Sequence, residues 1–239
     1  MKYLAAIFFA WMLGCPAFAT DIPSRIEISY HVTTDIGEGE INEVMEIRHA
    51  KDGHHSYTIN SEAQATGMFK LIEPNSIIRR SEGIITKHGL RPTRAYEKRG
   101  KKEPSLAVFD WEKHMITLQH NGHEIHEKLP ANAIDRLSLS YNFIFAPLPK
   151  HHVDRYVTNG QTLRLSHYRI SKEVLDTPIG KIETITLTRQ EEKNSKLKRK
   201  VWLALHNHML PVRIVSVEDN GREIDKIVTG INISYQPDH

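Results

Sequence analysis

The sequence predicts a mainly β protein: a curved antiparallel sheet or incomplete β-barrel with one buried helix near residues 134–145. Many short segments alternate apolar and polar residues with a period of two, as strands with one buried face do. Turns that contain glycine separate these segments, and one longer apolar run lies between two prolines. The chain has no alternating strand–helix pattern, no glycine-rich phosphate loop and no repeat, which argues against a parallel α/β fold.

The first 19 residues have the layout of a secretory signal peptide. Lys2 is followed by an apolar run of ten residues, Leu4 to Leu13, whereas a helix that spans a bilayer needs about 20 residues. Ala17 and Ala19 place small residues at the −3 and −1 positions of a cleavage site. We therefore expect a signal peptide at 1–19, a single β-rich domain at 20–239, and a periplasmic location.

The one cysteine of the chain, Cys15, lies inside this leader. A minority alternative is that Cys15 is acylated, which would make the protein an outer-membrane lipoprotein. After cleavage at Ala19 no cysteine remains, so we expect no disulfide and a fold held by its core.

The charge of the chain is only mildly basic, with a formal net charge of +3. This balance gives no support to a nucleic-acid partner. No apolar run after the leader approaches the length of a membrane span, so we expect no transmembrane segment in the mature chain. The sequence suggests no cofactor.

The strands follow one another as hairpins. Residues 25–32 alternate apolar and polar side chains, a glycine- and acid-rich turn follows, and residues 41–50 form the return strand. Asp52-Gly53, Asn121-Gly122 and Asn220-Gly221 supply the positive φ of tight turns. The segments predict roughly ten or more antiparallel strands. The further strand segments are 56–66, 83–87, 91–99, 105–111, 115–120, 162–170, 172–179, 181–190, 198–205, 210–219 and 223–235.

The run AIDRLSLSYNFIFAP, residues 133–147, fits both a half-buried strand and a helix. Its flanks decide between them, because Pro130 and Pro147 bound it and Asp135 is a favourable N-cap. We predict a helix from about Ile134 to Phe145. Since the run is apolar nearly all round, that helix is expected to be buried against the concave face of the sheet.

Several segments, in this order, resemble the bacterial exported family called domain of unknown function 3108. They are SEGIITKHGLRPTRAYEKR, FDWEKHMIT, DRLSLSY, LDTPIGKIETITLTR and VWLALHNHMLPVRIV. The resemblance implies a β-rich envelope protein, with a helix at DRLS, similar in shape to the curved-sheet carriers of lipoproteins and with no assigned reaction. The HNH at residues 206–208 departs from the short turn without histidines that is expected there.

Two groups of residues are candidates for ligand binding. On a strand, Arg94, Tyr96 and Lys98 share one face and could hold phosphate or carboxylate groups. The alternative is a solvated outer surface. Trp111 and Trp202 could line an apolar cavity, or they could be ordinary core residues.

A second set of candidates lies in the predicted helix. Asp135, Ser138 and Tyr141 could form part of a catalytic site, but no G-x-S-x-G elbow surrounds the serine. We favour a structural role, in which Asp135 and Ser138 cap the helix start and Tyr141 packs in the core.

The 15 histidines raise the question of a metal site. His120 and His123 should face each other across a hairpin, and His206 and His208 would share a strand face. Each pair supplies two ligands, whereas zinc needs three or four. We therefore expect no metal site, with these four residues as weak candidates.

The leading functional hypothesis is a non-enzymatic envelope protein that binds an apolar or amphipathic molecule, such as a lipid, in a curved-sheet cavity. One rival is an exported hydrolase or metal-binding protein that uses the histidines. Another is a structural partner of a second envelope protein. We lean away from an enzyme.

Overall fold

Fifteen strands form one sheet in the computed structural model, which describes residues 22–50, 55–72, 76–190, 198–217 and 221–235. The mainly β fold class is thereby confirmed. All paired neighbours are antiparallel except β9 and β10, which run parallel. The expected signal peptide, Cys15 and the Asp52-Gly53 turn lie outside the described residues.

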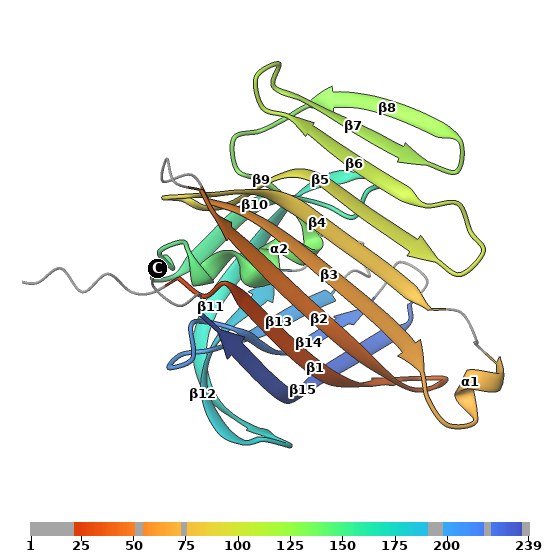
Figure 1. Ribbon diagram of the computed structural model, residues 1–239, viewed down its shortest axis with the longest axis vertical. Helices are drawn as coiled ribbons and strands as arrows, with labels where there is room; N and C mark the ends of the chain where they lie inside the picture. The colour runs from red at the N-terminus through yellow and green to blue at the C-terminus, as the bar shows by residue number, and fades with distance from the viewer. Residues whose placement is uncertain (1–21, 51–54, 73–75, 191–197, 218–220, 236–239) are drawn as a thin grey trace, which may run out of the picture.

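The sheet has two arms that meet at strand β1, which pairs with β2 on one side and β15 on the other (Figure 1). The first arm follows the chain order away from β1. Its strands are β1 (Arg25–Thr34), β2 (Gly37–His49), β3 (His55–Ala65), β4 (Ile77–Thr86), β5 (Gly89–Arg99), β6 (Ser105–Asp110), β7 (Met115–His120) and β8 (His123–Lys128), and the short helix α1 (Phe69–Ile72) connects β3 to β4.

The second arm runs in reverse chain order from β15 to β9, so the two ends of the sheet are β8 and β9. Its strands are β9 (Ala133–Asp135), β10 (His152–Thr158), β11 (Leu163–Thr177), β12 (Gly180–Arg189), β13 (Lys198–Ala204), β14 (Pro211–Val217) and β15 (Glu223–Ser234). The expected strands 162–170 and 172–179 are a single strand, β11. Strand β10 was not expected.

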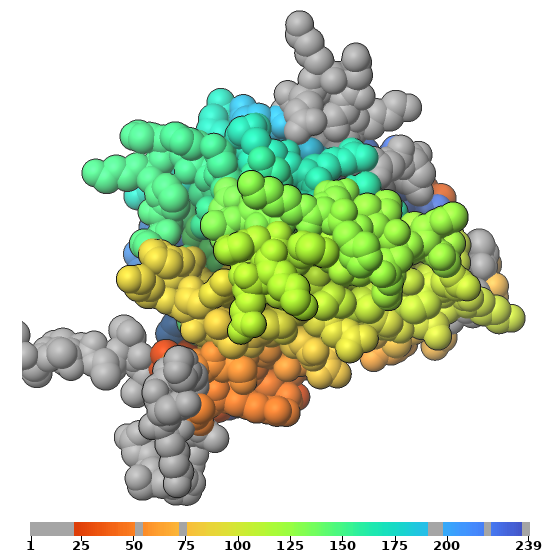
Figure 2. Space-filling model, turned by 90° about the horizontal axis from the view of Figure 1, so that it is seen from above, coloured from red at the N-terminus to blue at the C-terminus, as the bar shows by residue number. Residues whose placement is uncertain are grey.

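The sheet does not close by hydrogen bonds, but apolar side chains pack across the seam. Ala107, Phe109 and Leu118 of the first arm share a core cluster with Ala133 of β9, and Tyr156 of β10 packs against it. Figure 2 shows residues of β5 to β8, in yellow-green, lying next to those of β10 to β12, in green and cyan. The result is a nearly closed barrel with an interior.

The predicted helix occupies this interior as two short pieces, α2 (Arg136–Tyr141) and the 3₁₀ turn η1 (Asn142–Ile144). It begins at Arg136 rather than Ile134 because Asp135 is extended, with φ −82° and ψ 162°, and because β9 pairs with β10. The turn before β5 packs closely on it, since a Cβ added at Gly89 would lie 2.3 Å from Oδ1 of Asn142.

Two core clusters fix the helix on both sides. Tyr141 packs with Ile28 and Met45 of the β1–β2 wall, and Leu139 and Phe143 pack with Val201 and Leu203 of β13. Both faces of the helix are therefore buried, as its composition predicts. Among the residues that the structure describes, no helix is long and apolar enough to cross a membrane.

Candidate functional site

A cavity of about 640 Å³ lies beside the start of α2, between the β2–β5 wall and strands β13 to β15. Its size falls within the usual range for sites that bind small molecules. Part of the lining is apolar: Val32, Ile41, Ala63, Phe69, Ile77, Leu137, Ile214 and Ile224. The remainder is strongly charged, with nine basic and five acidic side chains among the described residues that line it.

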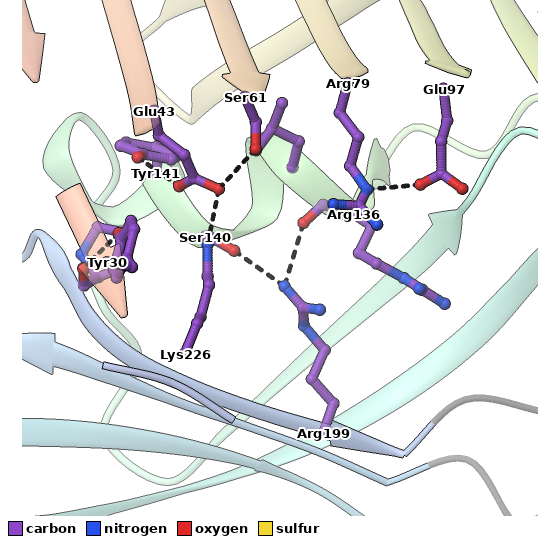
Figure 3. Close-up of polar contacts among 12 residues, drawn as sticks. Tyr30, Glu43, Ser61, Arg79, Glu97, Arg136, Ser140, Tyr141, Arg199 and Lys226 are labelled. Atoms are coloured by element: carbon purple, nitrogen blue, oxygen red, sulfur yellow. Dashed lines mark hydrogen bonds and ion pairs between the residues drawn. The ribbon is translucent and has the colours of Figure 1, made fainter. Parts of the chain in front are cut away.

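A buried ion pair joins the two walls of the cavity (Figure 3). Nζ of Lys226 on β15 donates to Oε1 of Glu43 on β2 at 2.7 Å, and the ammonium group lies 4.2 Å from the centre of the Tyr30 ring. Glu43 also accepts hydrogen bonds from Ser61 at 3.1 Å and from Tyr141 of α2 at 2.7 Å. Burial opposes ionisation of Glu43, but Lys226 and these donors outweigh it and lower the pKa of the carboxyl group.

A second ionic cluster lies on strands β4 and β5 of the β2–β5 wall. Glu97 on β5 accepts from Nε of Arg79 at 2.5 Å and from Nε of Arg99 at 2.6 Å. Burial would raise the pKa of Glu97, yet the attraction of the two guanidinium groups lowers it to about 2. Arg79 therefore enters the cavity already paired with a carboxylate.

Arg199 on β13 extends from the opposite wall toward α2 (Figure 3). Its Nη2 donates to Oγ of Ser140 at 3.0 Å and to the backbone oxygen of Arg136 at 3.4 Å. Its Nε is buried and has no hydrogen-bond partner, and no carboxylate in the described chain pairs with Arg199. The pKa of this guanidinium is lowered to about 10, mainly because burial removes water from the charge. Nearby Arg136 and Arg79 act in the same direction, whereas Tyr168 and Glu43 oppose them.

The start of α2 is attached to the wall by a buried cluster of hydrogen bonds around Asp135. Oδ1 of Asp135 accepts the backbone N–H groups of Leu137 and Ser138 at 2.9 Å, so Asp135 is the N-cap. The hydroxyl of Ser138 bonds to Tyr57 at 2.9 Å and to Ser81 at 2.7 Å, and Ser81 donates to Asp135 at 2.7 Å. Burial raises the pKa of Asp135.

This cluster has the geometry of a structural link. Ser138 is fully buried and its side-chain partners are hydroxyl groups, while Tyr141 bonds to Glu43. A serine nucleophile needs a base within hydrogen-bond reach and access to substrate. The hydrogen bonds of Ser138 supply no such base.

The predicted stripe on β5 divides between the surface and the cavity. Arg94 and Lys98 are exposed, and Tyr96 is half-buried and contributes to the cavity lining. Strand alternation places Glu97 on the other face, where it meets Arg79. The structure therefore does not bring Arg94 and Lys98 into the cavity.

Neither predicted tryptophan lines the cavity. Trp111 stacks on Phe109 with a centroid distance of 6.0 Å and donates to the carbonyl of Pro92. Trp202 is buried, donates to Glu173, and lies beneath Lys200 at 4.4 Å from the ring centre. Both rings are packed by neighbouring strands.

The histidine candidates lie in two separate places. His120 and His123 are partners across the β7–β8 hairpin, as expected. His206 lies 3.2 Å from Glu183, and His208 lies 3.1 Å from the hydroxyl of Tyr235. In the described part of the chain, no three His, Cys, Asp or Glu side chains are grouped so as to hold a metal ion.

Apart from Asp135, the charged residues of the cavity were missed in the sequence, although Glu43 and Lys226 leave a signal there. Glu43 occupies an apolar position of β2, between Ile41 and Met45, and Lys226 lies between Ile224 and Val228 on the same face of β15. A charge at a position that periodicity assigns to the core indicates a buried, functional or paired group. The partners of each charge could not be read from the sequence.

The fold has a counterpart among solved structures, although no curated protein matches the chain. The crystal structure of a beta-barrel-like protein of domain of unknown function DUF1849 from Brucella abortus aligns with a TM-score of 0.52 at 8% identity. The alignment covers 90% of this chain and 99% of that one, so the two share a fold.

The family comparison agrees with the resemblance seen in the sequence. The model of the family described as protein of unknown function DUF3108 matches residues 25–226, from the start of β1 into β15. The match covers most of the chain and includes every strand that lines the cavity. The chain therefore belongs to the DUF3108 family.

Proposed function

We propose that this protein is a non-enzymatic, exported envelope protein that binds an amphipathic molecule with an anionic group in the cavity beside α2. The observation that carries the proposal is the lining of that cavity, which joins an apolar wall to an excess of basic side chains. An apolar chain gains free energy by leaving water, at about 25 cal/mol per Å² of buried surface. The anionic group of the same ligand would pair with the basic side chains of the lining.

The location of the cavity supports the same proposal. It lies inside a sheet whose ends are not joined by hydrogen bonds, beside a helix that both arms hold in place. A rigid interior of this kind binds a ligand without the cost of ordering a loop. Export rests on the leader at residues 1–19.

The enzymatic alternative has less support. The carboxyl groups with an unusual environment are Glu43, Glu97 and Asp135, and each is held by partners that belong to the fold. Ser138 is fully buried. Glu43 and Asp135 join the helix to the sheet, and Glu97 pairs with arginines of β4 and β5, which are structural tasks.

A fluorescent fatty-acid probe, dansylated undecanoic acid, tests whether the cavity is the binding site. We expect the wild type to bind the probe. The emission of the dansyl group should then shift to the blue, because this group leaves water together with the apolar chain of the probe. Ala63→Trp should abolish the shift, since Ala63 lines the cavity and a large ring fills it.

The matched control is Ser56→Trp, which adds the same ring to an exposed position of the same strand, β3. Thermal melts of both variants establish that they are folded, because overpacking costs about 1–3 kcal/mol. Absence of probe binding by the wild type, or equal binding by Ala63→Trp and wild type, would contradict the proposal.

A further inference from the structure

A second, smaller pocket of about 60 Å³ adjoins the main cavity. It has room for a small polar group but not for a long apolar chain. The two share five lining residues: Arg136, Thr158, Asn159, Arg199 and Ser216. A single ligand can therefore occupy both.

The lining of the small pocket differs sharply from that of the main cavity. Five of its described residues are basic and none is acidic, whereas only Val157 and Val217 are aliphatic. Ser166, Thr158 and Ser216 add hydroxyl groups. Hydroxyl donors and guanidinium groups around a small volume are typical of sites that bind tetrahedral oxyanions.

Arg199 stands at the junction of the two spaces, and its charge is not balanced by the described chain. Nη2 makes both of its hydrogen bonds, to neutral oxygens of Ser140 and Arg136, and the buried Nε has no acceptor. A buried charge without a counter-ion is unfavourable. Lys226 and Arg79, which line the main cavity, each have a carboxylate.

Arg164 adds a second cation to the small pocket from β11. It lies on the same strand face as Ser166 and Tyr168, which also line this pocket, and its side chain is exposed. Because Arg164 is exposed, its removal leaves the core intact. It therefore provides a test that does not disturb folding.

We propose that the small pocket binds a phosphate-type anion, with Arg199 and Arg164 as its main cationic contacts, and that this anion is the head group of the molecule whose apolar chain fills the main cavity. This inference rests on the proposed function, because it names the chemistry of the ligand that the main cavity takes. The shared chemistry of a lipid head group and free phosphate is a tetrahedral oxyanion.

Isothermal titration calorimetry with decyl phosphate, decanol and inorganic phosphate tests the inference on the full folded chain. We expect decyl phosphate to bind at least about tenfold more tightly than decanol, which shares its apolar chain, because charge-assisted hydrogen bonds hold the phosphate. Arg199→Gln and Arg164→Gln should each weaken decyl phosphate binding by about tenfold. Neither should change the affinity for decanol.

Arg94→Gln is the matched control, because Arg94 is exposed on β5 and lies outside both pockets. It should bind all three probes as the wild type does. Tight binding of inorganic phosphate alone, lost in Arg199→Gln, would support the site with a free anion as occupant. Binding only of the alkyl ester would support a lipid head group.

Two results would separate the two proposals. Equal affinities for decyl phosphate and decanol, or unchanged decyl phosphate binding in both Arg199→Gln and Arg164→Gln, would overturn the head-group site but leave the apolar cavity supported. Failure of both decyl compounds to bind the wild type would overturn the proposed function. If inorganic phosphate also failed to bind, the anion site would be overturned with it.

Discussion

Lys226 and Arg199 enter the same cavity from the same wall, yet only Lys226 has a carboxylate partner. Lys226 is 2.7 Å from Glu43, whereas Arg199 donates to the neutral oxygens of Ser140 and Arg136. Lys226 is buried, and Arg199 is half-buried with its Nε away from water. An ion that has left water without a partner is costly. From this comparison we infer that Lys226 serves the fold, whereas Arg199 remains available for the anion proposed above.

The largest expected effect is the loss of the paired carboxylate. Glu43→Gln should lower the free energy of unfolding by about 3–5 kcal/mol, because it leaves the Lys226 ammonium buried without a counter-ion. Urea unfolding measures this loss. The control is Glu46→Gln on the same strand, which breaks an exposed pair with Arg25 and should cost about 1 kcal/mol or less.

The double variant Glu43→Gln/Lys226→Met sharpens the same test. We expect it to be more stable than Glu43→Gln alone, since it removes the stranded charge as well. The ion pair would not hold the two walls together if Glu43→Gln lost less than about 1 kcal/mol of unfolding free energy. The same conclusion would follow if the double variant were no more stable than Glu43→Gln.

The next effect is the acid sensitivity of the Arg79–Glu97–Arg99 cluster. The folded pKa of Glu97 is about 2, below its ordinary value, so its contribution is present near neutral pH and is lost as the pH falls through the folded pKa. Between about pH 5 and pH 2 the protonation of Glu97 should lower the free energy of unfolding by about 3 kcal/mol.

Urea unfolding across this pH range should therefore show a smaller pH-dependent loss for Glu97→Gln than for the wild type. Glu112→Gln, at an exposed position, should follow the wild type. Parallel curves for Glu97→Gln and the wild type would mean that Glu97 has an ordinary pKa in the folded protein.

The smallest effect on stability is expected at Arg199. Arg199→Gln should change the free energy of unfolding in the absence of ligand by less than about 1 kcal/mol, because it removes a charge without a carboxylate partner. A loss comparable to that of Glu43→Gln in urea unfolding would place Arg199 among the structural charges and remove the contrast with Lys226.

The sequence revealed the local parts of this architecture. The strands follow from period-two alternation, and the cap at Asp135 follows from its position before an apolar run, because both depend on near neighbours in the chain. The extra strand β10 was missed, since its residues are only partly buried and alternate weakly.

The charged cavity could not be assembled in the same way. Glu43 and Lys226 are 183 positions apart, and Glu43 and Tyr141 are 98 apart. Their pairing depends on how the two arms of the sheet meet around α2, which periodicity does not specify. Charged residues at core positions of a strand indicate that each is paired inside the protein. Only the fold identifies the partners and shows that Arg199 has no carboxylate partner in the described chain.

Native mass spectrometry of the full chain, produced in a bacterial host and purified from the periplasmic extract where the proposed export would deliver it, tests the central claim most directly. We expect wild type and Ser56→Trp to carry an additional mass that fragments as an anionic amphipathic molecule. Ala63→Trp should lack that mass, because the ring fills the space that the apolar chain occupies. Ligand-free wild type, or the same bound mass in Ala63→Trp, would contradict the account.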